Sequence, residues 1–338
     1  MKILVLGPSW VGDMVMTQAL FALLKQRQPN AIIDVLAPEW SRPLLARMPE
    51  VRNALTLPLQ HGELQLKKRF QLGRQLQSEN YDQAIVIPNT FKAALIPFWA
   101  TIPKRTGWRG EMRWGVLNDL RVLDTKQLPQ IVQRFMALGI PADEVLPEIL
   151  PQPKLHITPA IRAETLAKFA LNTDKPILAL CPGAEYGPSK RWPPAYFAQV
   201  ALAKLAEGWQ VWLFGAAKEQ ALTAAIQQAS RSTCIDLCGR TSLAEAIDLL
   251  SCANAVVSND SGLMHMAAAL NRPLIALYGA TDPNFAPPLT QRAKSLSLSL
   301  SCSPCAKRIC PLGHMKCLNN LRPDWVLSSL NELLAADI

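Results

Sequence analysis

Long uninterrupted apolar segments are missing from this chain of 338 residues. A membrane-spanning helix needs roughly 20 consecutive apolar residues, and no uncharged stretch approaches that length. The first residues, MKILVLGPSWVGD, also lack the build of a secretory signal, because Gly, Pro and Asp13 interrupt them and no small-residue cleavage site follows. We therefore expect a cytoplasmic protein.

Acidic residues are in the minority: 26 Asp and Glu stand against 35 Lys and Arg, a net charge of +9. This balance favours anionic or phosphate-bearing partners. Helix-turn-helix, zinc-finger and aromatic RNA-binding signatures are missing, so we expect no nucleic-acid partner. Six basic residues lie between Lys92 and Arg121, against Glu111 and Asp119. The sequence leaves open whether they form a solvated face or a binding surface.

The eight cysteines do not indicate a disulfide framework, because a cytoplasmic chain keeps its thiols mostly reduced. Four lie in or beside apolar runs and are expected to be small core residues: Cys181, Cys234, Cys238 and Cys252. The other four lie within 16 residues, with His314 among them: Cys302, Cys305, Cys310 and Cys317. Their spacing fits neither the two-knuckle zinc pattern nor a ferredoxin run. A structural metal and free thiols with occasional disulfides both remain open.

The order of apolar segments indicates the fold class. Short apolar runs, such as residues 2–6 and 31–36, alternate with helical patterns such as residues 16–24. This alternation predicts an α/β fold of parallel sheets covered by helices on both faces. The second half repeats it from residue 177 onward, after a proline-rich stretch at residues 139–159.

The length favours two domains of roughly 150 residues each. We expect domains at residues 1–150 and 176–322, a linker at 151–175 and a terminal helix at 323–338. Each domain is predicted to be a doubly wound, Rossmann-like sheet, and the two to face each other across a cleft. Ligands of such sheets bind at the carboxyl ends of the strands.

The first candidate loop, residues 7–13, joins a strand to a helix, so its amides are suited to an anion. It has neither the three glycines of a dinucleotide fingerprint nor the lysine of a P-loop. Asp13 stands at the mouth of the helix. It either caps free amides or acts as a general base for an incoming hydroxyl group.

The second candidate loop, residues 181–193, places Lys190 and Arg191 just before a helix. Two cations there suit a diphosphate leaving group, because they neutralise the charge that develops as its bond to the sugar breaks. The alternative is a solvated basic pair.

In the third candidate loop, a strand ends at Asn259 and Asp260, and a helix begins at once with Ser261 and Gly262. Glycine lets a phosphate approach the backbone, and the exposed amides and the helix dipole hold it. His265, one turn later, is placed to hydrogen-bond a ligand.

Three further residues near these loops have two interpretations each. Leu263 and Met264 either line a slot for a nucleotide base or belong to the core. Glu219 follows another strand end, where it either binds ribose hydroxyls or stabilises the first helical turn.

Taken in order, these loops resemble those of the bacterial lipopolysaccharide heptosyltransferases. The resemblance rests on Gly12-Asp13, Lys190-Arg191-Trp192 and Asp260-Ser261-Gly262-x-x-His265, and it spans nearly the whole chain. Arg42-Pro43-Leu44-Leu45 and residues 105–111 are most like the heptosyltransferase II branch. The threonine pair usual before the lysine is replaced here by Glu185-Tyr186.

The resemblance implies a GT-B-type fold and an inverting glycosyltransferase. This would move L-glycero-D-manno-heptose from ADP-heptose to the first heptose of the lipopolysaccharide inner core on Kdo-lipid A. Residues 1–150 would bind the acceptor, and residues 176–322 the donor. Asp13 would deprotonate the acceptor hydroxyl, and Lys190 would stabilise the departing diphosphate.

The resemblance also implies two sets of binding residues. The donor would contact Ser9, Gly12, Gly183, Lys190, Arg191, Glu219, Asp260, Ser261, Gly262, Leu263, Met264 and His265. The anionic acceptor would contact Arg69, Lys92, Arg105 and Arg109. Because the acceptor lies at the inner membrane surface, we expect a monomer that is peripheral there. No Asp-x-Asp motif is present, so we expect no metal or other cofactor.

Two other functions remain open. One is a GT-B-type transferase with a different nucleotide-sugar donor, and the other is a non-catalytic sugar-nucleotide-binding protein. A general base at Asp13 argues against the second, because binding alone needs no base. A nicotinamide-dependent oxidoreductase is disfavoured by the broken glycine pattern.

Overall fold

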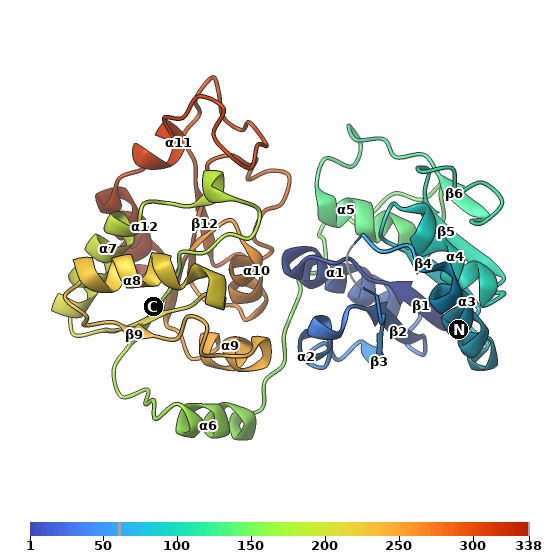
Figure 1. Cartoon of the computed structure of the whole chain (residues 1–338), viewed down its shortest axis with the longest axis horizontal. Helices are drawn as coiled ribbons and strands as arrows, with labels where there is room; N and C mark the ends of the chain where they lie inside the picture. The colour runs from blue at the N-terminus through green and yellow to red at the C-terminus, as the bar shows by residue number, and fades with distance from the viewer. Residues whose placement is uncertain (60–61, 337–338) are drawn as a thin grey trace. The chain divides into compact units, whose positions relative to one another are not determined.

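The computed structural model describes residues 1–59 and 62–336, which form two compact units, Met1–Pro153 and Lys154–Ile338. Each unit contains one six-stranded sheet with helices on its faces (Figure 1). Within the described residues, no helix is both long and apolar enough to cross a membrane.

The first unit is built on a wholly parallel sheet with strand order β3-β2-β1-β4-β5-β6. Its strands are β1 (Lys2–Leu6), β2 (Ile32–Ala37), β3 (Val51–Thr56), β4 (Gln83–Val86), β5 (Lys104–Trp108) and β6 (Asp119–Arg121). Its helices are α1 (Val11–Arg27), α2 (Arg42–Leu45), α3 (Leu66–Leu76), α4 (Phe91–Trp99) and α5 (Ile131–Met136). The central strand β1 is apolar throughout its buried part, as expected for a parallel strand covered on both faces.

The second unit repeats this arrangement with strand order β12-β11-β10-β7-β8-β9. Its strands are β7 (Ile177–Cys181), β8 (Gln210–Leu213), β9 (Ile235–Asp236), β10 (Ala255–Asn259), β11 (Leu274–Leu277) and β12 (Ala293–Leu296). Its helices are α6 (Pro159–Lys168), α7 (Pro194–Ala206), α8 (Gln220–Ala229), α9 (Leu243–Leu250), α10 (Gly262–Ala269), α11 (Lys316–Asn319) and α12 (Pro323–Ala335). The α/β fold with two doubly wound parallel sheets predicted from the sequence is therefore confirmed.

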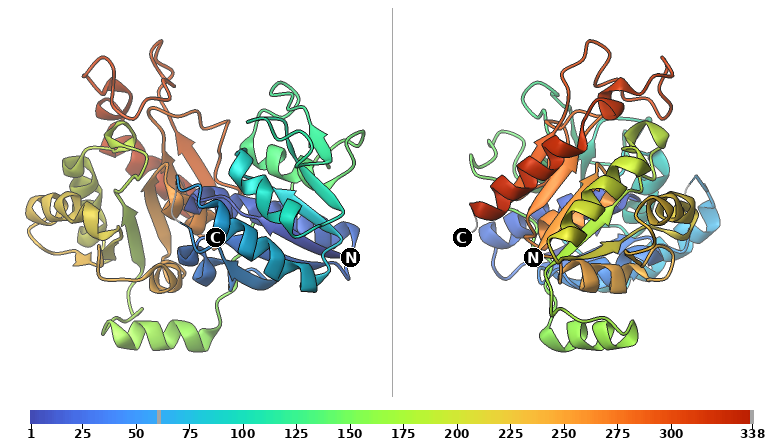
Figure 2. Two further views of the ribbon diagram at one scale, coloured as in Figure 1. Left: turned by 45° about the vertical axis from the view of Figure 1, so that its right-hand side comes forward. Right: turned by 90° about the vertical axis from the view of Figure 1, so that its left-hand side faces the viewer.

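The segment expected to be a linker, residues 151–175, contains the helix α6. Pro159 occupies the start of α6, where its missing amide costs nothing, and the side chain of Thr158 accepts a hydrogen bond from the amide of Ile161. The Thr165 hydroxyl donates to the Asp248 carboxylate on α9 over 3.3 Å. Proline thus begins a helix here instead of marking only loop, and Figure 2 shows this helix (light green) at the outside of its unit.

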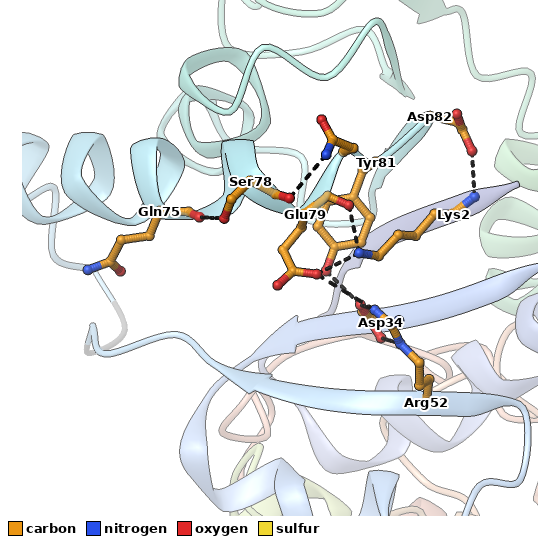
Figure 3. A network of polar contacts seen from close by, with 9 residues as sticks. Lys2, Asp34, Arg52, Gln75, Ser78, Glu79, Tyr81 and Asp82 are labelled. Carbon is orange, nitrogen blue, oxygen red and sulfur yellow. Dashed lines mark hydrogen bonds and ion pairs between the residues drawn. The ribbon is translucent and has the colours of Figure 1, made fainter.

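A network of polar and charged side chains lies near the amino ends of the strands of the first unit (Figure 3). Asp34 is almost completely buried, yet it accepts hydrogen bonds from Arg52 Nε (3.0 Å) and from the Tyr81 hydroxyl (2.6 Å). Burial alone would raise the pKa of Asp34, but the bonds from Arg52 and Tyr81 together lower it. Lys2 pairs with Glu79 beside them (Nζ–Oε2 2.5 Å). This network fixes the pairing of β1, β2 and β3 at the edge remote from the loop that carries Asp13.

Candidate functional site

The order of strands in the second unit brings four loops together. Strands β8, β7, β10 and β11 are neighbours in the sheet and run parallel, so their carboxyl ends lie along one edge. Glu219 follows β8, and the Lys190 loop follows β7. Asp260 follows β10, and residues 278–282 follow β11. The edge of a doubly wound sheet where the strand order changes direction is where ligands bind.

Asn259, the last residue of β10, ties two of these loops together. It is fully buried, and its side-chain oxygen accepts a hydrogen bond from the Trp192 amide (3.1 Å). Its side-chain nitrogen donates to the carbonyl of Pro182 (2.7 Å). The loop that carries Lys190 is therefore fixed at both ends to the end of β10.

Lys190 and Asp260, both predicted site residues, form an ion pair with Nζ 2.6 Å from Oδ2. Their side chains are largely buried, with 14% and 7% of their surfaces exposed. The hydroxyl of Thr281 donates to the same carboxylate oxygen. Thr281 is not among the residues identified from the sequence, because no recognised motif lies at the end of the apolar run that precedes it.

His265 is buried in the first turns of α10, close to this pair. Burial lowers its pKa to about 4, with Asp260 opposing the shift and Lys190 adding to it. The imidazole is therefore neutral near pH 7. A neutral imidazole can donate one hydrogen bond to a ligand oxygen without bringing a charge of its own.

Gly183 and Glu219 lie against each other at the ends of β7 and β8. A Cβ atom on Gly183 would stand 2.2 Å from the carboxylate of Glu219, so any larger residue there would displace this carboxylate from its present position. Glu219 is buried and accepts a hydrogen bond from the amide of Ala216 over 2.9 Å. The structure thus shows the helix-stabilising role, and the carboxylate keeps further lone pairs that can accept hydrogen bonds.

The amino end of α10 lies beside Asp260. Ser261 is the N-cap residue with an extended backbone, and Gly262 is the first helical residue. Leu263 is half-buried, whereas Met264 is fully buried and its sulfur accepts a hydrogen bond from the Tyr278 hydroxyl (3.4 Å). Met264 therefore lies in the core of its unit.

Arg191 is half-buried, and its guanidinium donates to the carbonyl of Ala184 over 3.4 Å. Its Nε is buried without a hydrogen-bond partner among the described residues. A buried donor without a partner costs free energy. Lys190, Arg191, neutral His265 and the amino end of α10 are the groups here whose chemistry suits an anion with several oxygens.

The loop of the first unit that carries Asp13 joins β1 to α1. Gly7 packs closely at its start, because a Cβ atom there would lie 2.6 Å from Met14 Cε and would displace that methyl group. Ser9 and Trp10 are exposed, and Trp10 is the N-cap residue. Asp13, with the preceding Gly12, is half-buried in the first turn of α1, where the helix dipole favours a carboxylate.

The basic residues predicted to contact the acceptor differ in their surroundings. Arg69 is buried and donates to the backbone carbonyls of Glu63, Leu64 and Lys92. Arg105 is half-buried and donates to the carbonyls of Val116 and Ile102. Both therefore bind backbone within the unit.

Other basic residues between Lys92 and Arg121 also differ, some being accessible to solvent and others buried. Arg109 is exposed and Lys92 is half-buried. Arg113, almost fully buried, donates to the carbonyl of Pro88 over 3.0 Å. Arginines that serve as internal carbonyl clamps cannot be distinguished from surface cations by sequence spacing, because both occur in polar loops.

All eight cysteines are free thiols. Cys181, Cys234 and Cys238 are buried and Cys252 is half-buried. In the clustered segment, backbone amides led by that of Met315 lower the pKa of Cys310, whereas burial raises that of Cys317. Over the described ranges, no three His, Cys, Asp or Glu side chains are arranged to hold a metal ion.

A family profile and similar known sequences agree on the family to which this chain is related. The profile of glycosyltransferase family 9 (heptosyltransferase) matches residues 69–316. The chain is 47% identical to lipopolysaccharide heptosyltransferase 2 of Escherichia coli K12, over 99% of each chain. It is 48% identical to lipooligosaccharide heptosyltransferase 2 of Haemophilus influenzae, over 99% of this chain and 100% of that protein.

Solved structures agree with this relationship. The structure of E. coli ADP-heptose lipopolysaccharide heptosyltransferase II superposes with a TM-score of 0.90 at 44% identity, covering 100% of this chain and 99% of that one. A family 9 glycosyltransferase from Veillonella parvula shares the fold with a TM-score of 0.85 at 19% identity, over 99% and 97% of the two chains. The chain therefore belongs to glycosyltransferase family 9, the heptosyltransferases.

Proposed function

We propose that this enzyme transfers L-glycero-D-manno-heptose from ADP-heptose to the first heptose of the lipopolysaccharide inner core, with inversion of the anomeric centre. The observation that carries the proposal is the buried Lys190–Asp260 pair beside the amino end of α10. Such an arrangement suits a nucleotide diphosphate, and relatives that align over the whole chain are named as heptosyltransferase 2.

In the second unit, the donor's diphosphate would accept hydrogen bonds from the first amides of α10 and from Lys190. Negative charge accumulates on the diphosphate as its bond to the anomeric carbon breaks, and a preorganised ammonium group and helix dipole stabilise that charge. Neutral His265 would donate to a diphosphate or heptose oxygen. Glu219 would accept from the ribose hydroxyls of the adenosine.

In the first unit, Asp13 would act as the general base. The acceptor hydroxyl gives its proton to the Asp13 carboxylate while its oxygen attacks the anomeric carbon, and ADP leaves from the opposite side. One displacement forms one C–O bond and breaks another, so the configuration inverts. Lys190 and the α10 dipole supply the charge stabilisation that a divalent cation supplies in other sugar-nucleotide enzymes, so the proposed reaction uses no cofactor.

The acceptor would be the anionic inner core on lipid A, at the inner membrane surface, with the enzyme acting as a peripheral monomer. Arg109, which is exposed, and Lys92, which is half-buried, are the predicted acceptor contacts whose side chains remain accessible to a ligand. Arg69 and Arg105 would act indirectly, by shaping the loops that they clamp.

Mass spectrometry of a transfer reaction tests the proposal. The purified enzyme is incubated with ADP-heptose and heptosyl-Kdo-lipid A, and the acceptor is expected to gain the mass of one heptose. Parallel reactions replace the donor with a UDP-sugar or the acceptor with Kdo-lipid A that lacks heptose. Product with a UDP-sugar but none with ADP-heptose would overturn the donor, and product only on Kdo-lipid A would overturn the acceptor.

A further inference from the structure

The loop that carries Lys190 rests on three consecutive residues far along the chain, Ala306 to Arg308. The Tyr186 hydroxyl donates to the carbonyl of Ala306 over 2.7 Å. The Ser189 amide donates to the carbonyl of Arg308 over 3.2 Å, and the Ser189 hydroxyl donates to the carbonyl of Lys307. The backbone of residues 306–308 therefore accepts a bond from each end of the turn that leads to Lys190.

Residues 303–306 are in turn hydrogen-bonded to the residues that follow β11. The amide of Ala306 donates to the carbonyl of Ala280 over 2.7 Å, and the Ser303 hydroxyl donates to the carbonyl of Gly279. Thr281, the next residue, donates to Asp260. The contacts thus form a closed path from Tyr186 through Ala306 and Thr281 to Asp260 and back to Lys190.

Two cations lie over the ring of Tyr186. Lys190 Nζ is 5.0 Å from the ring centroid, and the guanidinium carbon of Arg308 is 5.6 Å from it. Both distances are within the range of a cation–π attraction. The Lys190 ammonium is therefore held by the Asp260 carboxylate (2.6 Å) and also by the face of Tyr186.

We propose that Tyr186 is a positioning residue for Lys190. Lysine has a flexible four-carbon stem, and a single ion pair fixes only the distance of its ammonium from one partner. The face of the Tyr186 ring adds a second contact to the ammonium. The ammonium is then already placed before charge develops on a leaving diphosphate, which is the condition for effective electrostatic stabilisation. This inference rests on the function proposed above.

Residues 306–308 belong to the segment that contains the clustered cysteines. The three carbonyls that receive Tyr186 and Ser189 lie between Cys305 and Cys310. The backbone conformation of this cysteine segment is thereby tied to the position of the lysine.

Two substitutions of Tyr186 separate the ring from its hydroxyl. Tyr186→Leu removes both, and kcat for transfer from ADP-heptose should fall about three- to tenfold, in the range of a partly buried cation–π contact. Tyr186→Phe keeps the ring and should hold kcat to within about twofold of the wild type, because it loses only one solvent-exposed hydrogen bond. KM for ADP-heptose should change less than kcat in both variants, since Lys190 acts mainly on the departing charge.

Tyr196→Leu is the matched control. Tyr196 is also half-buried, donates its hydroxyl to a carbonyl (Asn319, 3.0 Å) and has a cation over its ring, but that cation is Arg322 (5.8 Å). Its kcat should stay near the wild-type value even if the thermal midpoint falls as far as in Tyr186→Leu. Equal losses of kcat in the two leucine variants would mean a general structural effect and would overturn the inference.

A double-mutant cycle decides whether Tyr186 acts through Lys190. In the Lys190→Ala background, Tyr186→Leu should have no further effect on kcat, because the group that it positions is gone. Additive losses would overturn the positioning role. Failure of the proposed function looks different: the wild type would form no product with ADP-heptose, or Lys190→Ala alone would leave the rate unchanged.

Discussion

Asp260 binds Lys190 and Thr281 at once, so one buried carboxylate joins the loops after three neighbouring strands. The sequence identified Lys190 and Asp260 as separate candidates from their positions before helices. It did not identify Thr281, and it gave no role to Asn259. Both of these act through contacts with loops that are far away in the chain, and those contacts exist only because β10 lies between β7 and β11.

For a single residue of the first unit, we expect Asp13→Ala to abolish heptose transfer and to leave the affinity for ADP nearly unchanged. The substitution removes the proposed base, whereas Lys190, Glu219 and the amino end of α10, which are proposed to bind ADP, belong to the other unit. Product formation by mass spectrometry and ADP binding by calorimetry measure the two effects. Asp143→Ala, which removes an exposed carboxylate of the same unit, is the control and should retain activity. Near-normal turnover of Asp13→Ala would rule out the base.

His265 predicts a pH dependence of stability. Its pKa is lowered from 6.5 to about 4, so between these values the unfolded chain binds a proton that the folded chain does not. The stabilisation is therefore complete above pH 6.5 and is lost as the pH falls towards 4, by roughly 3 kcal/mol in total. Urea denaturation at pH 7 and pH 5 should show a smaller decrease for His265→Gln than for the wild type. His156→Gln, at an exposed position, should keep the wild-type decrease.

Among the elements, the helices of the second unit show how local sequence sets the position where a helix begins. Ser242 caps α9 by accepting from the Glu245 amide, and the Glu245 carboxylate accepts in return from the Ser242 amide (2.7 Å). Glu245 also pairs with Lys168 of α6. Such a reciprocal cap can be read from sequence.

The edge strands β6, β9 and β12 were not identified from the sequence, because short strands with polar residues lack a hydrophobic period.

Removal of the Ser242 cap of α9 should lower the free energy of unfolding by a measurable amount. We expect Ser242→Ala to lower the free energy of unfolding by about 1 kcal/mol, because one amide of the first turn of α9 loses its partner. Chemical denaturation measures the loss. Ser242→Asp, which restores a capping oxygen, should recover most of it. An equal loss in the aspartate variant would show that the serine acts by packing and not by capping.

The whole molecule consists of two units, each with its own hydrophobic core. The first core includes Leu4, Leu36 and Val86, and the second includes Leu180, Val257 and Leu277. A protein of this kind need not unfold in a single two-state transition. Binding of ADP to one unit should then stabilise that unit selectively.

Differential scanning calorimetry tests this expectation. ADP at about 100 times its Kd should stabilise the transition of the second unit by about 2.7 kcal/mol and leave that of the first unit unchanged. Tyr81→Phe, which removes a hydrogen bond to buried Asp34, should lower the transition of the first unit and so identify it. A shift of the Tyr81-sensitive transition with ADP would contradict the assignment of the nucleotide to the second unit.

The sequence by itself determined the fold class and the main candidate residues. Apolar strands that alternate with amphipathic helices, glycines at strand ends and charged residues at helix starts are local features that follow directly from backbone and side-chain chemistry. Only the tertiary structure decided which of these residues meet. It paired Lys190 with Asp260 and placed Glu219 against Gly183, it buried Arg69 and Met264, and it set Tyr186 against Lys190 and residues 306–308. Such contacts depend on strand order and packing over long chain separations, which no local pattern encodes.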